Sequence, residues 1–257
     1  MKMKVLAKEK DRLVFVAEGL HEAAANTLRR LIMSSVPTLA IDEVAMERNS
    51  SALYDEALAH RLGLVPLVTD LKSYKEKEKC ACKGKGCAQC TLTLTLKAKG
   101  PGSVYASSLE SKDPKVKAVY ENMLIVKLVK DQEIKLSATA VLGRGEQHMK
   151  FSPGLVYYKG CPIIAIEKKS GIKKCIDASS NNLAEKGDHL IVKDILKWNE
   201  AMEEVCEKNG MKVDASKEDF VFFVESWGQL APKEMVAKAV ELFDDKLDEC
   251  EKLVKAI

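Results

Sequence analysis

Hydrophobic residues near the N-terminus first follow the two-residue period of a strand and then the longer period of a helix. Alternation over Met3–Ala7 and Leu13–Glu18, around the polar turn KEKDR, predicts a pair of strands that Gly19 ends. The next segment stops at Pro37 and has helical spacing at Ala24, Leu28, Leu31, Ile32 and Ser35. This stripe predicts a helix with one face packed against a partner.

The middle of the chain has the short-period pattern of strands. Ile41, Val44 and Met46 alternate with charged residues, which predicts a half-buried strand, and the run ALYDEALAHRLGLV then predicts a helix that closes near Gly63 and Pro66. Further strands are predicted at TLTLTLKAKG, SVYASSL, MLIVKLVK and EIKLSATAVLG. Short strands at PIIAIEKKS and HLIVKD and a helix at WNEAMEEVCEKNG come later.

The C-terminal region predicts one apolar strand, Phe220–Ser226, and one long helix that begins at Pro232. Along that helix, apolar residues recur at alternating spacings of four and three, at Val236, Val240, Phe243, Leu247, Cys250 and Val254. This is the seam of a coiled-coil-like pairing. The stripe could also pack within its own domain, because an amphipathic helix needs only one apolar surface to cover it.

The residues from Asn26 to Leu67 closely resemble the D-subunit family of archaeal DNA-directed RNA polymerases, which is related to the eukaryotic third-largest subunit and the bacterial alpha amino-terminal domain. The motifs NxLRR, at Asn26–Arg30, and RLGLVPL, at Arg61–Leu67, carry the resemblance, which extends over nearly the whole chain. It implies a non-catalytic assembly subunit of the polymerase, a nucleotidyltransferase complex of archaeal transcription. An isolated pair such as Arg29 and Arg30 is usually a solvated helix face, but the flanking motif favours a contact surface.

The resemblance also implies an α+β fold in three parts. These are a discontinuous alpha-like dimerisation domain (residues 1–40 and 214–257), a β-rich insertion domain (41–160) and a ferredoxin-like insertion (161–213). Implied partners are subunit L, as a heterodimer, the large catalytic subunits, and the small subunits N and P. The expected interface residues are Asn26, Leu28, Arg29, Arg30, Val236, Val240, Phe243, Leu247 and Cys250.

Composition limits the alternatives. The net charge of +3 arises from 41 basic and 38 acidic residues, a balance that argues against a protein built to neutralise a phosphate backbone. Any contact with DNA is therefore expected to be indirect. The chain has no apolar run long enough to span a bilayer and no hydrophobic leader, so a cytoplasmic location is expected.

Four of the eight cysteines form a CxCx4CxxC motif around a Lys-Gly-Lys-Gly turn, namely Cys80, Cys82, Cys87 and Cys90. Two close pairs of thiolates can surround one tetrahedral ion, and zinc can organise a short loop that has no core of its own. The motif therefore predicts one structural zinc. The alternative is a reduced cysteine-rich loop without stoichiometric metal.

In this family the second insertion often carries CxxCxxCxxxCP runs that hold iron–sulfur clusters. Here Cys175 alone survives of one run, and the other run is lost, so we predict a ferredoxin-like fold without a cluster, with Trp198 as the largest apolar filler. Cys161, Cys175 and Cys206 could converge in space, but they lack a ligand spacing and are therefore assigned to packing. In a cytosolic chain, cysteines favour metal binding or packing over disulfides. Cys250 is expected to act as a small hydrophobe on the helix seam.

No catalytic residues are predicted in the chain. Its four histidines lie on different elements without a partnered nucleophile, and the sequence lacks the DxDxD cluster that holds catalytic magnesium in polymerases. Two other functions remain open, an iron–sulfur redox protein and a zinc-dependent nucleic-acid-binding module. The polar loop Gly143–Gly154 also resembles the family and suits a protein–protein contact of unidentified partner.

Overall fold

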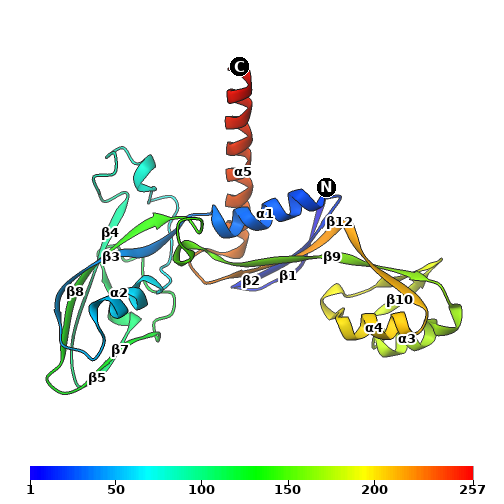
Figure 1. Ribbon diagram of the computed structural model, residues 1–257, viewed down its shortest axis with the longest axis horizontal. Helices are drawn as coiled ribbons and strands as arrows, with labels where there is room; N and C mark the ends of the chain where they lie inside the picture. Colours follow the sequence, from blue (N-terminus) through cyan, green and yellow to red (C-terminus); the bar gives the residue numbers. More distant parts are fainter. Residues whose placement is uncertain (257) are drawn as a thin grey trace. The chain divides into compact units, whose positions relative to one another are not determined.

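The computed structural model describes residues 1–256 and combines helices with sheets, which confirms the α+β class. The helices are α1 (Glu22–Ser34), α2 (Asp55–Gly63), α3 (Ile172–Ala178), α4 (Glu200–Lys208) and α5 (Pro232–Lys255) (Figure 1). The strands are β1 (Lys2–Lys8), β2 (Arg12–Glu18), β3 (Thr38–Asn49), β4 (Thr91–Lys99), β5 (Gly102–Tyr105), β6 (Glu110–Ser111), β7 (Leu124–Leu128), β8 (Glu133–Gly143), β9 (Gly154–Ile166), β10 (Leu183–Lys186), β11 (His189–Val192) and β12 (Met211–Ser226). None of these described helices is long and apolar enough to cross a membrane.

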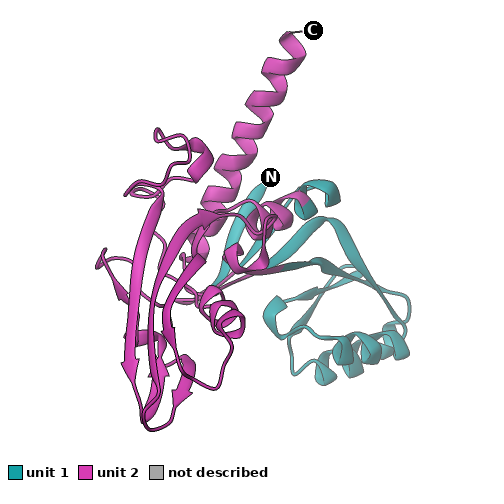
Figure 2. Cartoon of the chain, turned by 60° about the vertical axis from the view of Figure 1, so that its left-hand side comes forward, with its two compact units in different colours: residues 1–7, 14–26, 157–223 teal, residues 8–13, 27–156, 224–257 magenta. Residues whose placement is uncertain are grey.

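The described strands form three sheets, with the orders β1-β2-β12-β9-β11-β10, β3-β8-β4-β6 and β5-β7. The chain divides into two compact units (Figure 2). Unit 1 consists of residues 1–7, 14–26 and 157–223, and unit 2 of residues 8–13, 27–156 and 224–257.

The core of unit 2 lies between the β3-β8-β4-β6 sheet and helix α2. Leu92, Leu94 and Leu96 on β4 are buried, while the intervening threonines are half-buried, as the alternating sequence predicts. Leu58 and Leu62 of α2 are fully buried in the same cluster. Burial of each of these leucine side chains stabilises the folded state by about 2 kcal/mol relative to leaving it exposed. This core is therefore a main source of stability for the insertion.

Unit 1 contains two hydrophobic clusters along the same long strands. Cys161 of β9 packs with Val221 of β12 in one cluster, and Ile164 of β9 packs with Met211 of β12 in the other. Phe15 and Phe222 are stacked with ring centroids 5.1 Å apart. Both long strands begin earlier than the sequence predicts, because each is paired with neighbouring strands of the sheet.

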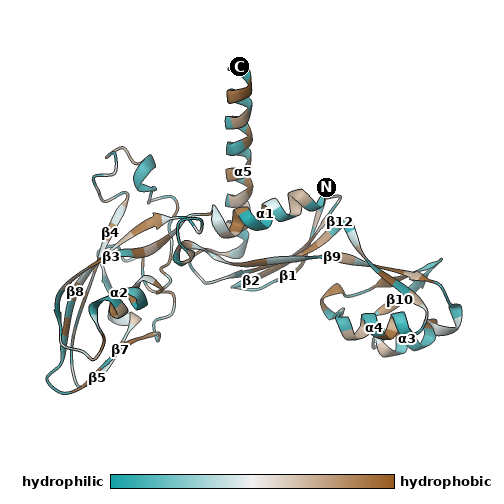
Figure 3. Cartoon of the chain, in the orientation of Figure 1, coloured by the Kyte–Doolittle hydropathy of each residue, from teal (hydrophilic) through white to brown (hydrophobic). Residues whose placement is uncertain are grey.

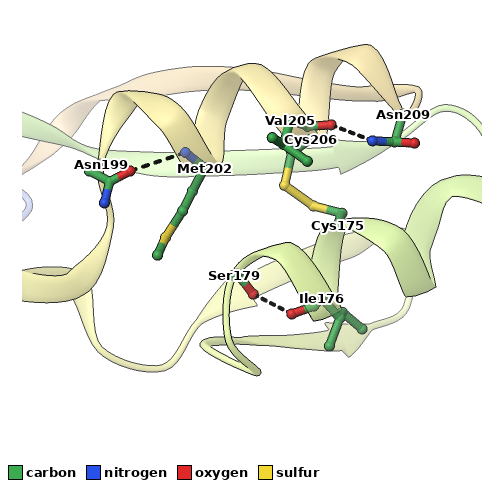
Figure 4. Close-up of a disulfide and its surroundings, with 8 residues drawn as sticks. All are labelled: Cys175, Ile176, Ser179, Asn199, Met202, Val205, Cys206 and Asn209. Atoms are coloured by element: carbon green, nitrogen blue, oxygen red, sulfur yellow. Dashed lines mark hydrogen bonds between the residues drawn. A yellow bond between two sulfur atoms is a disulfide. The ribbon is translucent and has the colours of Figure 1, made fainter.

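The second cluster contains a disulfide between Cys175 of α3 and Cys206 of α4 (Figure 4). Both residues are fully buried, as packing requires, but the sequence pattern predicts neither the bond nor helix α3. The prediction of packing alone is therefore wrong for this pair. The reason is that α3 has only seven residues and that the two cysteines are 31 positions apart, so no local pattern relates them. Trp198 belongs to this cluster, as expected.

We expect the double substitution Cys175→Ala, Cys206→Ala to lower the free energy of unfolding of this segment by about 3–4 kcal/mol, because the bond closes a loop of 31 residues in the unfolded chain. Urea unfolding followed by the fluorescence of the buried Trp198, in a Trp227→Phe background, measures the change. Cys250→Ala is the control, since Cys250 is exposed and unbonded. An unchanged urea midpoint would contradict the stabilising role of the bond.

Candidate functional site

Helix α5 changes from a buried to an exposed environment along its length. Met235, Val236, Ala239 and Leu242 are buried, whereas every described residue from 243 to 256 is exposed. Apolar side chains that are nevertheless exposed follow the predicted seam, with exposed fractions of 45% at Val240, 38% at Phe243, 53% at Leu247 and 65% at Val254. Figure 3 shows apolar residues along α5 up to its C-terminal end. Exposed apolar side chains grouped in this way are typical of surfaces that bind another molecule.

Helix α1 separates its buried and polar positions as the sequence predicts. Leu31 and Ile32 are buried, Leu28 is half-buried, and Asn26 and Arg30 are exposed. The guanidinium of the half-buried Arg29 lies 3.7 Å from the sulfur of Met33, one turn further along the helix. The two arginines therefore have different surroundings, and Arg30 is the more accessible of the pair.

The RLGLVPL motif has a structural role inside unit 2. The guanidinium of Arg61 donates hydrogen bonds of 2.7 Å to the backbone carbonyls of Leu124 and Ile125. These bonds hold the end of α2 to β7. Leu62, Val65 and Leu67 of the motif are buried in the main cluster of the unit.

The four cysteines of the CxCx4CxxC motif come together in space. Their sulfur atoms all lie within 4.8 Å of one another, with 3.5 Å between Cys80 and Cys87 and 3.5 Å between Cys82 and Cys90. Cys80 and Cys90 are buried, and Cys82 and Cys87 are half-buried. A set of four thiols at one point can hold one metal ion.

Tight turns bring the two cysteine pairs together. The carbonyl of Cys80 accepts from the amide of Lys83, and the carbonyl of Cys87 accepts from the amide of Cys90, at 3.0 and 2.9 Å. Between the pairs, Gly84 has a φ of 81°, a left-handed conformation in which a side chain would be strained. The Lys-Gly-Lys-Gly sequence therefore allows the chain to reverse direction between the two halves of the site.

The thiols of the cluster do not titrate alike. Burial opposes ionisation of Cys82, but hydrogen bonds from Cys90 and Cys80 outweigh it and lower the pKa of Cys82 to about 6. At Cys90, burial dominates and raises the pKa of the thiol to about 12. Because a metal ion binds thiolates, metal binding at this site would release protons from those thiols that are still protonated.

The other cysteines lie elsewhere. Cys161 is half-buried in the first cluster of unit 1, where burial raises the pKa of its thiol to about 11, and it does not join Cys175 and Cys206. Cys250 is exposed on the α5 seam. Sequence reasoning missed the ion pair between Glu76 and Arg144 beside the cysteine loop, since no motif links residues 68 positions apart.

Comparison with known proteins identifies the family. Residues 43–155 match the model of the RNA polymerase Rpb3/RpoA insert domain. DNA-directed RNA polymerase subunit Rpo3 of Pyrococcus furiosus is 36% identical over 254 residues, which cover 96% of this chain and 95% of the relative. The Rpo3 subunit of Methanosarcina acetivorans is 37% identical, and the match covers 97% of this chain and 96% of the relative. The Rpo3 subunit of Archaeoglobus fulgidus is 34% identical, and the match covers 98% of this chain and 97% of the relative. Such identity along nearly the whole length confirms the resemblance seen in the sequence, and the chain belongs to the archaeal Rpo3 family, the D subunits of DNA-directed RNA polymerase.

Proposed function

We propose that the chain is a non-catalytic assembly subunit of DNA-directed RNA polymerase. The observation that carries this proposal is the match to Rpo3 subunits along 96% of the chain. The chain supplies binding surfaces, and the nucleotidyltransferase chemistry belongs to other subunits of the complex. Within this function, residues 1–40 and 214–257 would form the dimerisation domain, residues 41–160 the insertion domain, and residues 161–213 the ferredoxin-like domain.

The proposed partner of the α5 seam and of helix α1 is subunit L, as a heterodimer. Exposed apolar residues at three- and four-residue spacing support this role, because a second helix with a matching seam would bury them. Arg29 and Arg30 would serve contacts toward the large catalytic subunits, and subunits N and P are further partners by resemblance. Co-expression of the chain with subunit L, followed by size-exclusion chromatography, tests the proposal. Separate elution of the two chains would contradict it.

The metal proposed for the four cysteines is zinc in a structural role. Zinc binds thiolates at about 2.3 Å, which places the sulfur atoms of a tetrahedral site about 3.8 Å apart. The shortest sulfur–sulfur distances, 3.5 and 3.8 Å, are compatible with this geometry. Cys80, Cys82, Cys87 and Cys90 would hold the ion and close the loop around it. Lys83 and Lys85 offset the charge of the thiolates.

We further propose that the segment 161–213 contains no iron–sulfur cluster. The mutual bond of Cys175 and Cys206 supports this, since a cluster needs several free thiolates. Anaerobic purification followed by iron and acid-labile sulfide assays should give substoichiometric values for both. About four irons per chain with matching sulfide, the content of one cubane cluster, would contradict the proposal and restore a redox role.

The two alternative functions have no support from the comparisons. A redox protein would need cluster ligands in unit 1, where two of the three cysteines are paired with each other. A zinc-dependent nucleic-acid-binding module would need a concentrated basic surface, whereas the chain has a net charge of only +3. DNA contact is therefore proposed to be indirect at most.

A further inference from the structure

A bidentate ion pair connects the segment before the cysteine motif to the loop Gly143–Gly154. The Nε and Nη2 atoms of Arg144 donate to the carboxylate oxygens of Glu76 at 2.5 and 2.9 Å. The exposed fractions of the two side chains are only 17% and 19%. Hydrogen bonds from Arg144 lower the pKa of Glu76, so the pair stays charged at neutral pH. Bidentate pairs of this kind fix orientation as well as distance.

On one side, the position of Glu76 depends on the cysteine loop. Its backbone carbonyl accepts from the amide of Lys79, one residue before Cys80, at 3.0 Å. The preceding amide, that of Lys75, donates to the carbonyl of Gln89, the residue before Cys90, at 2.8 Å. Closure of the loop by its four cysteines therefore places Glu76 where it can bind Arg144.

On the other side, Arg144 begins a turn that is pressed against the C-terminal end of α1. The amide of Glu146 donates to the carbonyl of Ser34 at 3.0 Å. A Cβ atom on Gly145 would lie 2.2 Å from the carbonyl oxygen of Met33, a contact that leaves no room for any side chain. Met33 also carries the sulfur that lies 3.7 Å from the guanidinium of Arg29, so the turn contacts a residue that in turn touches Arg29.

We propose that Glu76 and Arg144 are positioning residues that couple the metal-bound cysteine loop to the C-terminal end of α1. With metal bound, the loop holds Glu76, Glu76 holds Arg144, and the turn at Gly145 fixes the last turn of the helix. Loss of metal releases this end, and with it the proposed partner-binding face around Arg29 and Arg30. The inference rests on the proposed zinc site and deepens the assembly function by making it depend on metal.

Hydrogen exchange of the full-length chain, zinc-loaded and then treated with a chelator, tests the coupling. The reporter amides are those of Glu146, bonded to Ser34, and of Ser35 and Val36, bonded to Leu31. We expect chelation to speed their exchange by about tenfold or more, since they lose a supporting contact. Amides of the paired strands β4 and β8 serve as the internal control for global unfolding.

Variants of the pair separate coupling from simple stability. Glu76→Gln keeps all four cysteines, so it should retain zinc. Because it removes the charge of the pair with Arg144, its reporter amides should exchange fast even with zinc bound and should not respond to the chelator. Exchange of the two charges, in Glu76→Arg with Arg144→Glu, should restore the response. Glu121→Gln, which breaks the exposed pair with Lys117, is the matched control and should behave as the native chain.

Two results would overturn the coupling. One is that chelation speeds exchange in the cysteine loop but leaves the reporter amides unchanged, and the other is that Glu76→Gln responds to the chelator as the native chain does. A native chain without stoichiometric metal by elemental analysis would overturn the coupling together with the zinc assignment. Because partner subunits are absent from this experiment, a failure of the proposed heterodimer would be seen in co-elution alone.

Discussion

The substitution Phe243→Asp is expected to abolish stable association with subunit L. Phe243 lies in the middle of the exposed apolar seam of α5, between Val240 and Leu247. In the heterodimer an aspartate there would be buried without a partner, at a cost of several kcal/mol. A loss of about 2 kcal/mol of binding free energy makes the affinity roughly thirtyfold weaker. The two chains should then separate during size-exclusion chromatography.

Ala237→Asp is the matched control, because it introduces the same side chain at an exposed position of α5 outside the seam. It should co-elute with subunit L as the native chain does. Circular dichroism of both variants checks that the helix is retained. Retention is expected because Phe243 is already 38% exposed. Unchanged co-elution of Phe243→Asp would rule out the seam as the heterodimer interface.

The double substitution Cys87→Ser, Cys90→Ser is expected to reduce bound zinc from about one ion per chain to none. It removes two of the four ligands, and serine does not replace a thiolate in such a site. Elemental analysis of purified protein measures the content. Because metal binding stabilises the folded loop, proteolysis between Lys72 and Thr91 should also become faster.

Cys161→Ser, Cys250→Ser is the control for this experiment, as it removes two thiols that lie outside the cluster. It should retain the zinc. A native chain without stoichiometric zinc, or zinc that persists in the Cys87→Ser, Cys90→Ser variant, would refute the assignment.

Local patterns were sufficient to predict several parts of the fold. The alternation from Thr91 to Leu96 predicted β4, because one face of a strand in a two-layer structure is buried and the other is not. The helical spacing around Leu31 and Ile32 predicted α1 for the same reason. The convergence of the four cysteines was also predicted, since the ligand residues lie close together in sequence and a short turn joins them.

Features that depend on distant residues were not predictable in this way. The seven residues of α3 are too few to display a helical period, and the bond from Cys175 to Cys206 depends on how two helices meet. The pair of Glu76 and Arg144 is likewise formed only by the folded insertion. The residues that form these contacts are far apart in the sequence, and only the tertiary structure brings them together.

The long strands β9 and β12 connect the cluster that contains the disulfide to the rest of unit 1. Each strand contributes to two separate clusters of unit 1, so the backbone framework of the second cluster is continuous with that of the first. The bond between Cys175 and Cys206 can therefore be removed without removing the strands that frame it.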